Sequence, residues 1–465
     1  MDRPAHDVKP MPFATDFSPE RIARFLAAET QRFRQAHPKS AALYAQAQRH
    51  LLFGVPMHWM ADVPAPVPLF VDRAQGAQLW DVDGHALVDF CLGDTGAMFG
   101  HSPEAVTRAL AEFAGQGATT MLPSTVALEV GALLEQRFGL PMWQFTATAS
   151  DANRFVLRWA RAITGRPKVV AFNGSYHGTV DDVFVDLAPD GSAITRPSLL
   201  GQVHDLAAFT RVVEFNDLPA LEAALAPGDV ACVITEPVLT NIGMVLPDPG
   251  FLQSLRAMTR KHGTLLVIDE THTISCGPGG YTRAFGLDPD ILVLGKPIAG
   301  GTPGAVYGFT TEVGTRMQKA KQAAAPGHSG IGTTLSAGLL TLRLMRAMLS
   351  EVMTDAAYTR MFAISRRVAD GLQAAITSRG LAWTVTRIGA RCEYQFAPER
   401  PRNGSQARAA MHDDLEAALQ LALLNRGVLL TPFHNMVLAS PAHTEADAQA
   451  LLGAFADALD ALSAA

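Results

Sequence analysis

The sequence predicts an α/β protein built around a mostly parallel β-sheet, and three observations support this fold class. Two short apolar runs, at residues 265–268 and 291–294, stop abruptly at Asp269-Glu270 and at Gly295-Lys296. Short apolar runs bounded by turn residues are typical of strands buried on both faces. Between residues 145 and 295 such runs alternate with helical patterns, which is the order expected of βαβ units with right-handed crossovers.

The remaining elements follow from apolar periodicity and turn signals in chain order. Residues 1–20 are Pro-rich and predict a loose arm, and residues 19–50 have a helical pattern. Residues 69–90 predict a β-meander whose hairpin turn contains Asp83-Gly84. Further segments have a regular pattern: helices are expected at 104–113, 126–138, 151–163 and 251–262, and strands at 168–172 and 230–235.

Three segments are expected in the domain organisation. Residues 1–80 form an arm that joins the small domain, residues 81–340 a large domain, and residues 341–465 a smaller α+β domain. A single long apolar helix at residues 335–353 is expected to be the strut between the two domains. A chain of 465 residues is long enough for this division.

Composition narrows the function classes. Hydrophobic residues make up 48% of the chain and the formal net charge is −6, without a basic run that interleaves with aromatic residues, so no nucleic-acid partner is expected. There is no apolar stretch of the ~20 residues needed to cross a membrane, and no apolar secretory region near the start. The four cysteines are scattered without metal-ligand spacing, which predicts reduced thiols, a cytoplasmic protein and no metal site.

Asp269 and Lys296 are the first candidates for chemistry. Ligands of open parallel sheets bind beyond the carboxyl ends of the strands, and both residues follow a predicted strand. Each has an ordinary explanation by itself, the aspartate as a cap and the lysine as a solvated strand end. The glycine-rich segment 300–304 after Lys296 lets a flat ligand approach, and a lysine near an acid is suited to forming a Schiff base.

Residues 148–152, Thr-Ala-Ser-Asp-Ala, run into a predicted helix. Small residues and hydroxyls at a helix N-terminus are suited to binding a phosphate group. Simple helix capping accounts for the same residues equally well.

The motifs together resemble one family. Val267-Ile268-Asp269-Glu270, Leu294-Gly295-Lys296 with Gly300-Gly301, and Tyr176-His177-Gly178 resemble the class III (subgroup II) pyridoxal-phosphate aminotransferases of fold type I. The chain is most similar to the glutamate-1-semialdehyde aminomutase-like branch, which also holds amine and β-amino-acid transaminases. The resemblance runs from about residue 69 to the C-terminus, and it implies a mostly parallel seven-stranded sheet flanked by helices, a smaller α+β domain and pyridoxal 5′-phosphate as cofactor.

The resemblance also implies roles for individual residues. Lys296 would bond to the cofactor aldehyde, Asp269 would keep the pyridine nitrogen protonated, and Tyr176 would stack on the ring. Glu236 would lie beside the ring hydroxyl, and Thr271 would pack under the ring.

For the phosphate group the resemblance implies Thr148, Ala149 and Ser150. The corresponding family loop has Ser-Gly-Thr-Glu-Ala, so Ala149 replaces a glycine here. Thr333 would complete the phosphate site from a second subunit, in a homodimer or a dimer of dimers.

Two arginines of the family are missing, which bears on the substrate. An arginine that holds a substrate carboxylate in some relatives corresponds to Met60, beside His58 and Trp59, and a second one falls near Phe433. These four residues are expected to form an apolar substrate pocket, although ordinary packing explains aromatic residues equally well. Alternatives are that Arg391 or Arg387 binds the carboxylate; His272 is a further candidate for the border of the site.

The expected function is that of an aminotransferase. An amine without a neighbouring carboxylate would donate its amino group to a keto acid such as pyruvate by ping-pong kinetics, with Lys296 moving the proton. The alternatives are a 2,1-aminomutase of the glutamate-1-semialdehyde type and a β-amino-acid transaminase. A cofactor-binding protein without turnover is the remaining possibility.

Overall fold

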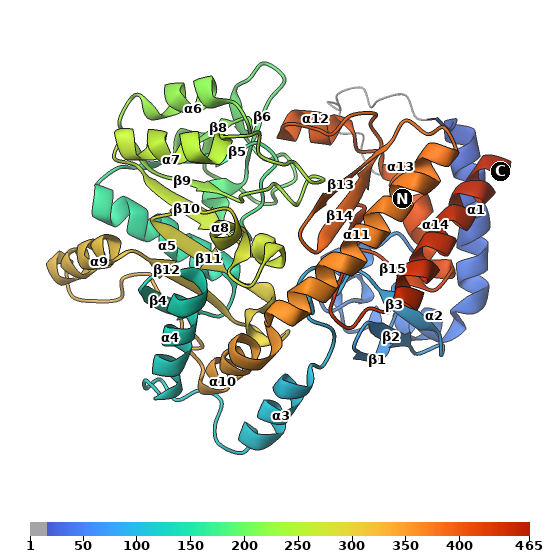
Figure 1. The fold of residues 1–465 in the computed structure, drawn as a ribbon, viewed down its shortest axis with the longest axis horizontal. Coiled ribbons are helices and arrows are strands. Elements are labelled where there is room, and N and C mark those ends of the chain that lie inside the picture. Colours follow the sequence, from blue (N-terminus) through green and yellow to red (C-terminus); the bar gives the residue numbers. More distant parts are fainter. Residues whose placement is uncertain (1–15) are drawn as a thin grey trace.

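The computed structural model describes residues 16–465, so most of the expected arm at residues 1–20 lies outside the described part. A seven-stranded sheet forms the centre of the larger half (Figure 1). In spatial order its strands are β4 (Met142–Thr146), β12 (Ala305–Phe309), β11 (Ile291–Leu294), β10 (Leu265–Asp269), β9 (Val230–Thr235), β5 (Lys168–Phe172) and β8 (Thr210–Val213). In this sheet β12 runs opposite to the other six strands, which confirms the predicted α/β fold with a mostly parallel seven-stranded sheet.

The central strands are buried on both faces, as their unbroken apolar runs predict. Along β10, Leu266 and Ile268 belong to the hydrophobic core on one face of the sheet, whereas Leu265 and Val267 belong to the core on the other face. This alternation follows from the two-residue period of a strand. The first core holds side chains of α3 (Glu104–Phe113), α4 (Val126–Phe138), α6 (Leu218–Leu225), α7 (Phe251–Lys261), α8 (Gly280–Ala284) and α10 (Leu339–Ala347), and the second those of α5 (Ala149–Thr164) and α9 (Thr311–Ala323).

The helix expected at residues 335–353 is present, but it begins later than predicted and is only the first part of the connection between the two halves. α10 begins only at Leu339, after Gly338, and ends in a π-helical turn at Met348–Val352. A second helix, α11 (Asp355–Ser378), begins where the Thr354 side chain accepts a hydrogen bond from the backbone of Ala357. Thr354-Asp355, directly after the predicted segment, is a helix-start signal. The two halves are therefore joined by two consecutive helices (Figure 1).

The smaller half is built from two sheets covered by helices. One sheet is antiparallel and contains β13 (Thr384–Ile388), β14 (Arg391–Gln395) and β16 (Met436–Leu438). The other contains β1 (Val71–Gln75), β2 (Gln78–Asp81), β3 (Ala86–Asp89) and β15 (Val428–Leu429). Helices α1 (Pro19–Ala36), α11, α13 (Asp413–Asn425) and α14 (Glu445–Ala464) contribute side chains to the core of this half. The short helix α12 (Gly404–Ala409) instead places Ala407 in the first core of the larger half. The β3–β15 pair and the packing of α10 on α3 and α4 join residues from opposite sides of the expected division at 340/341, and the expected division at 80/81 falls within β2. Both divisions stay predictions.

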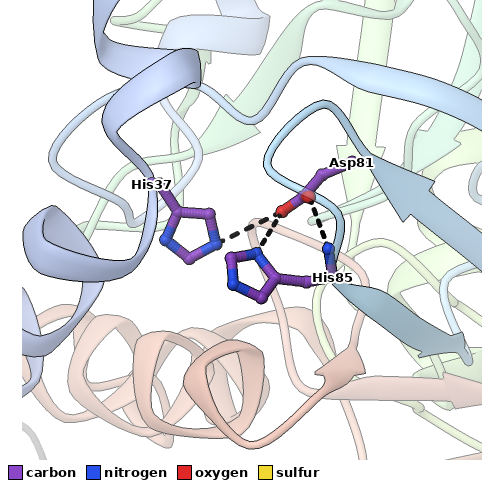
Figure 2. Close-up of side chains that lie close together, drawn as sticks. All are labelled: His37, Asp81 and His85. Atoms are coloured by element: carbon purple, nitrogen blue, oxygen red, sulfur yellow. Dashed lines mark hydrogen bonds and ion pairs between the residues drawn. The ribbon is translucent and has the colours of Figure 1, made fainter.

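A cluster of His37, Asp81 and His85 fastens the N-terminal helices to the β2–β3 hairpin (Figure 2). His37 ends α1 and precedes α2 (Pro38–Ala47), so the helical pattern at 19–50 is divided in two. The buried Asp81 carboxylate lies 2.9 Å from His85 Nδ1 and 3.3 Å from His37 Nε2, and it also accepts the backbone N–H of His85. The three side chains could together hold a metal ion, a pattern that sequence spacing did not reveal. The expectation of no metal site stays a prediction.

The described residues contain no helix with the length and hydropathy required to span a membrane. All four cysteines lie in this part of the chain, buried and without a disulfide.

Candidate active site

A cavity of about 360 Å³ lies at the carboxyl ends of the central strands. Because β11, β10, β9 and β5 are parallel neighbours, the residues that follow them meet at one edge of the sheet. The cavity is lined by nine of the residues expected from the sequence: Thr148, Ala149, Ser150, Tyr176, Glu236, Asp269, Thr271, His272 and Lys296. Their roles toward a cofactor are proposals that this geometry supports.

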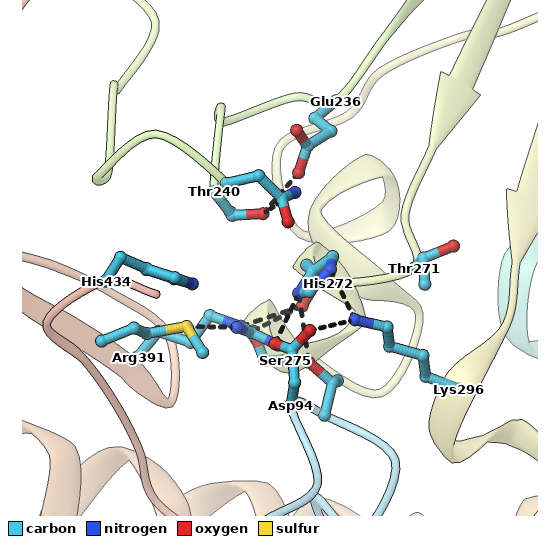
Figure 3. A network of polar contacts seen from close by, with 12 residues as sticks. Asp94, Glu236, Thr240, Thr271, His272, Ser275, Lys296, Arg391 and His434 are labelled. Carbon is cyan, nitrogen blue, oxygen red and sulfur yellow. Dashed lines mark hydrogen bonds and ion pairs between the residues drawn. The ribbon is translucent and has the colours of Figure 1, made fainter. Parts of the chain in front are cut away.

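Lys296 directly follows β11 and adopts a left-handed backbone conformation, with φ of 48°. Its Nζ lies 2.5 Å from Asp94 Oδ2 and 2.9 Å from His272 Nε2 (Figure 3). A lysine side chain that is fixed by two partners at the wall of a cavity is in position to react with a ligand held there.

Asp269 is a buried carboxylate with four hydrogen bonds. Oδ1 accepts from the backbone and the hydroxyl of Thr271 at 3.0 and 2.7 Å. Oδ2 accepts from Asn153 Nδ2 at 2.8 Å and lies 3.1 Å from His177 Nδ1. Burial would raise the pKa of Asp269, but His177, Thr271 and Asn153 outweigh it and lower this pKa to about 2. The cavity therefore contains a fixed negative charge that can hold a protonated ring nitrogen.

The N-terminus of α5 forms the opposite wall. The Thr148 hydroxyl accepts the backbone N–H of Asp151, so Thr148 is a true helix cap. Ala149 and Ser150, the first residues of the helix, line the cavity, where free N–H groups of a helix start favour an anion. Capping and anion binding are thus compatible here.

Two glycines allow this wall to form. Any Cβ at Gly178 would lie 2.2 Å from Ser150 Oγ, so the loop after β5 can pack on α5 only without a side chain there. Likewise, a Cβ at Gly295 would lie 2.8 Å from Ala149 Cβ. Ala149, which departs from the family loop, therefore fits because residue 295 is a glycine.

Glu236 and Tyr176 complete the lining. Glu236 is buried; one of its oxygens accepts from the Thr240 hydroxyl, while Oε1 has no hydrogen-bond partner among residues 16–465. Burial raises the pKa of Glu236 to about 7. Burial, followed by the charge of Asp94, also raises the pKa of Tyr176.

Asp94 is a site residue that sequence reasoning missed. It lies on a turn in which residues 92–95 all have positive φ, between 47° and 84°, which is unusual for residues other than glycine. Burial would raise the pKa of Asp94, but Lys296 and His272 hold it well below its usual range. In the sequence the only hint was the dipeptide Gly93-Asp94, which is typical of a turn. The positive φ values of this turn are a stronger hint, because strained backbone conformations gather at functional sites, but they appear only in the structure.

Several expected residues do not line this cavity in the described chain. Trp59 and Phe433 lie together, with ring centroids 6.3 Å apart, and both are nearly half exposed. Phe433 instead lines a separate groove beside residues 61–66. His58 and Met60 also lie outside the cavity, so the substrate role of these four residues stays a prediction. Thr333 is exposed and lies 3.1 Å from the Ser336 hydroxyl, and its place in a partner's site stays a prediction as well.

Neither alternative arginine lines the cavity in the described chain. Arg391 is fully buried behind His272, where it donates to the His272 carbonyl and to the Ser275 hydroxyl. Arg387 donates to the carbonyl of Gly389 in the smaller half. Among residues 16–465, the cavity lining therefore contains no guanidinium that could hold a carboxylate.

The residues present fit pyridoxal phosphate. The phosphate group requires free N–H donors, which the start of α5 offers, and the ring nitrogen requires the carboxylate of Asp269. The unpartnered Oε1 of buried Glu236 requires a donor, which a ring hydroxyl offers. Lys296 offers the amine for the aldehyde.

Comparison with known proteins agrees with this fit. Residues 60–459 match the family described as Aminotransferase class-III. A glutamate-1-semialdehyde 2,1-aminomutase from Anaeromyxobacter sp. (strain Fw109-5) is 32% identical over 431 residues, which cover 90% of this chain and 98% of the relative.

Two solved structures extend the comparison. The crystal structure of a glutamate-1-semialdehyde aminomutase from Pseudomonas aeruginosa PAO1 has 49% identity and a TM-score of 0.93, over 96% of this chain and 99% of that chain, and a lysine-to-alanine variant was solved with PMP. An omega-transaminase from Sphaerobacter thermophilus has 26% identity and a TM-score of 0.82, over 91% and 98% of the two chains. The chain thus belongs to the class III aminotransferases, and its cofactor is pyridoxal 5′-phosphate.

Proposed function

We propose that this enzyme moves an amino group from one carbon atom to the neighbouring one, as a 2,1-aminomutase of the glutamate-1-semialdehyde type. The observation that supports amino-group chemistry is the cavity that Lys296 and Asp269 share at one edge of the sheet. Support for the migration comes from the names of the relatives, since the first several at 31–35% identity and the structure at 49% are all named as this aminomutase. These names favour the alternative over the amine-to-pyruvate reaction that we expected from the missing arginines.

Bound pyridoxal phosphate supplies a carbonyl group that accepts an amino group and a ring that stabilises negative charge on the substrate carbon. The chain itself supplies the proton transfer and the orientation. Lys296 Nζ, when free, moves the proton between substrate carbon and cofactor. Asp269, fixed by four hydrogen bonds, keeps the ring nitrogen protonated, and the N-terminus of α5 orients the phosphate.

Transfer between two molecules is a second candidate with its own support. Glutamate-1-semialdehyde carries a carboxylate, which usually requires an arginine, and no arginine lines the cavity in the described residues. A solved structure at 26% identity is named an omega-transaminase, which also supports this candidate.

A single pair of assays separates the candidates. The enzyme, loaded with pyridoxamine phosphate, is given glutamate-1-semialdehyde without any acceptor. Repeated turnover to 5-amino-4-oxopentanoate is expected for the aminomutase, because each cycle returns the substrate's own amino group to the cofactor in place of the one it donated, so no acceptor is consumed. Ketone and alanine formed from an arylalkylamine and pyruvate would establish the transaminase instead, and no reaction in either assay would refute both. Lys296→Ala is the control that must be inactive in each.

We also propose that the active form is a homodimer. Met121, Leu122 and Leu335 are 80%, 74% and 64% exposed, and a hydrogen bond between Leu340 N and Ala118 O brings their two segments together. An exposed apolar patch of this kind marks an interaction site. Thr333 lies in the same region, in agreement with a role in the partner's phosphate site. Light scattering coupled to gel filtration should give twice the mass of one chain, and the monomer mass would contradict the proposal.

A further inference from the structure

The cluster of His37, Asp81 and His85 has the side-chain chemistry of a metal-binding site (Figure 2). We propose that it binds one divalent transition-metal ion of the zinc class, which joins the N-terminal helices to the β2–β3 hairpin. The ligand atoms are His37 Nε2, Asp81 Oδ2 and His85 Nδ1. In the described chain the lining of the active-site cavity includes none of the three, so this inference is independent of the proposed function. It departs from the expectation, based on the cysteine spacing, of a protein without a metal site.

The distances between the three ligand atoms suit a single ion. Asp81 Oδ2 lies 3.3 Å from His37 Nε2 and 2.9 Å from His85 Nδ1, and all three atoms lie within 4.8 Å of one another. An ion with bonds of about 2.1 Å separates neighbouring ligand atoms by about 3.4 Å in a tetrahedral site and by about 3.0 Å in an octahedral one. Imidazole nitrogen and carboxylate oxygen are both ordinary ligands of Zn²⁺. One ion can therefore contact all three side chains with only small shifts.

The protonation of His37 gives an independent reason for a cation at this place. His37 Nδ1 lies 2.8 Å from the Phe33 carbonyl oxygen, which can only accept a hydrogen bond, so Nδ1 carries a proton. Neutral His37 then has its lone pair on Nε2, and this atom faces a carboxylate oxygen of Asp81 that has only lone pairs as well. Both side chains are buried, so this contact is unfavourable unless a positive charge lies between the two atoms. A metal ion or a second proton on His37 supplies that charge.

The contacts around the ligands favour the metal ion over the proton. A metal-binding histidine usually donates its other ring N–H to a carbonyl or a carboxylate, as His37 does to Phe33. The two rings of this pair are also stacked, with centroids 3.9 Å apart, which fixes the orientation of the imidazole. Asp81 Oδ1 accepts the backbone N–H of His85 at 2.8 Å, which leaves Oδ2 to face both imidazoles (Figure 2). Each of the two buried ligands is therefore held in place by a contact outside the cluster or by backbone.

A neighbouring contact joins the same two segments without the histidines. Asp83, in the hairpin turn, accepts the backbone N–H groups of Lys39 and Ser40 at 2.7 and 3.0 Å and the Ser40 hydroxyl at 2.7 Å. The start of α2 is therefore held against the hairpin before any ion binds, and the site is preformed. His85 is its accessible member, with 41% of the side chain exposed, so an ion and a bound water can enter from solvent.

The test is a titration of the full chain with Zn²⁺, after loading with pyridoxal phosphate and removal of metal and excess cofactor. Calorimetry gives the stoichiometry and the affinity, and thermal unfolding gives the shift in the midpoint. We expect one ion per chain and a midpoint that rises with the zinc concentration, because the ion binds only the folded site. In His85→Gln and in Asp81→Asn the affinity should fall by more than the roughly 10- to 100-fold that loss of an outer contact causes.

His204→Gln is the matched control, because His204 is an exposed histidine of the larger half and its loss should leave zinc binding unchanged. His85→Gln changes the least buried ligand, and the absorbance of bound cofactor shows that the variant is folded. Equal zinc affinity in the wild type and all three variants would place the ion elsewhere and overturn the proposal. A wild type that binds no zinc would overturn it as well, and would leave a proton as the charge between His37 and Asp81.

Discussion

Replacing Gly178 with alanine should damage the cofactor site far more than the same change at Gly165. Both glycines have left-handed backbones, with φ of 81° and 69°, so both variants carry the cost of an alanine there, about 1–2 kcal/mol. A Cβ at Gly165 would meet no atom within 4 Å. A Cβ at Gly178 would lie 2.2 Å from Ser150 Oγ and 2.8 Å from Ser150 Cα, well inside the contact distance of about 3.5–4.0 Å.

The overlap at Gly178 must displace the first turn of α5, because a backbone atom of Ser150 is involved. Overpacking of this kind costs about 1–3 kcal/mol beyond the backbone term. The displaced N–H groups at the start of α5 would lose hydrogen bonds to the charged phosphate group. Each such bond contributes about 1.5–3 kcal/mol, so the loss of one lowers the affinity for pyridoxal phosphate roughly 10- to 100-fold.

Urea unfolding gives the stability of each variant, and absorbance titration with pyridoxal phosphate gives the affinity. We expect Gly165→Ala to lose stability alone and Gly178→Ala to lose both. If Gly178→Ala binds the cofactor as tightly as Gly165→Ala, the start of α5 does not form the phosphate site.

Two further predictions concern buried carboxyl groups. Burial raises the pKa of Glu236 from 4.5 to about 7. Between pH 4.5 and about 7 the folded protein therefore holds a proton on Glu236 that the unfolded chain has lost. The contribution of Glu236 to the free energy of unfolding should fall as the pH rises through this range, by up to about 1.4 kcal/mol per pH unit. Glu236→Gln should remove this slope in pH-dependent unfolding, and an unchanged slope would contradict it. Asp81→Asn should lower the free energy of unfolding by about 1–3 kcal/mol, because asparagine has one acceptor oxygen where the carboxylate has two, so it cannot accept from the His85 backbone and from both imidazoles; cofactor binding should stay intact. The exposed Asp72→Asn is its control and should change little; equal losses would show that the cluster contributes no stability.

The sequence was most informative where one strong local pattern decides the structure. The unbroken apolar runs of β10 and β11 place Asp269 and Lys296 at one edge of the sheet, and Asp83-Gly84 forms the expected turn, with Gly84 at φ of 98°. Each of these features depends on a few neighbouring residues. At residues 335–353 periodicity located a helix but placed its start four residues before Leu339, and the Thr354 cap, beyond that segment, decides where α11 begins.

Contacts between distant segments could not be predicted in the same way. Asp94 reaches Lys296 from a turn 202 positions earlier in the chain, and nothing in the local pattern around Asp94 specifies that contact. Arg391 was weighed as a carboxylate-binding residue, but its burial behind His272 depends on how the two halves pack. The expected pocket of Trp59 and Phe433 does bring two rings together, although away from the cavity that contains Lys296.

The covalent attachment site of the cofactor tests the central claim most directly. The protein is loaded with pyridoxal phosphate, reduced with borohydride, digested and analysed by mass spectrometry. We predict one phosphopyridoxyl group, on the peptide that contains Lys296, and its loss in Lys296→Ala. A modification on another lysine, or none on the loaded protein, would contradict the account.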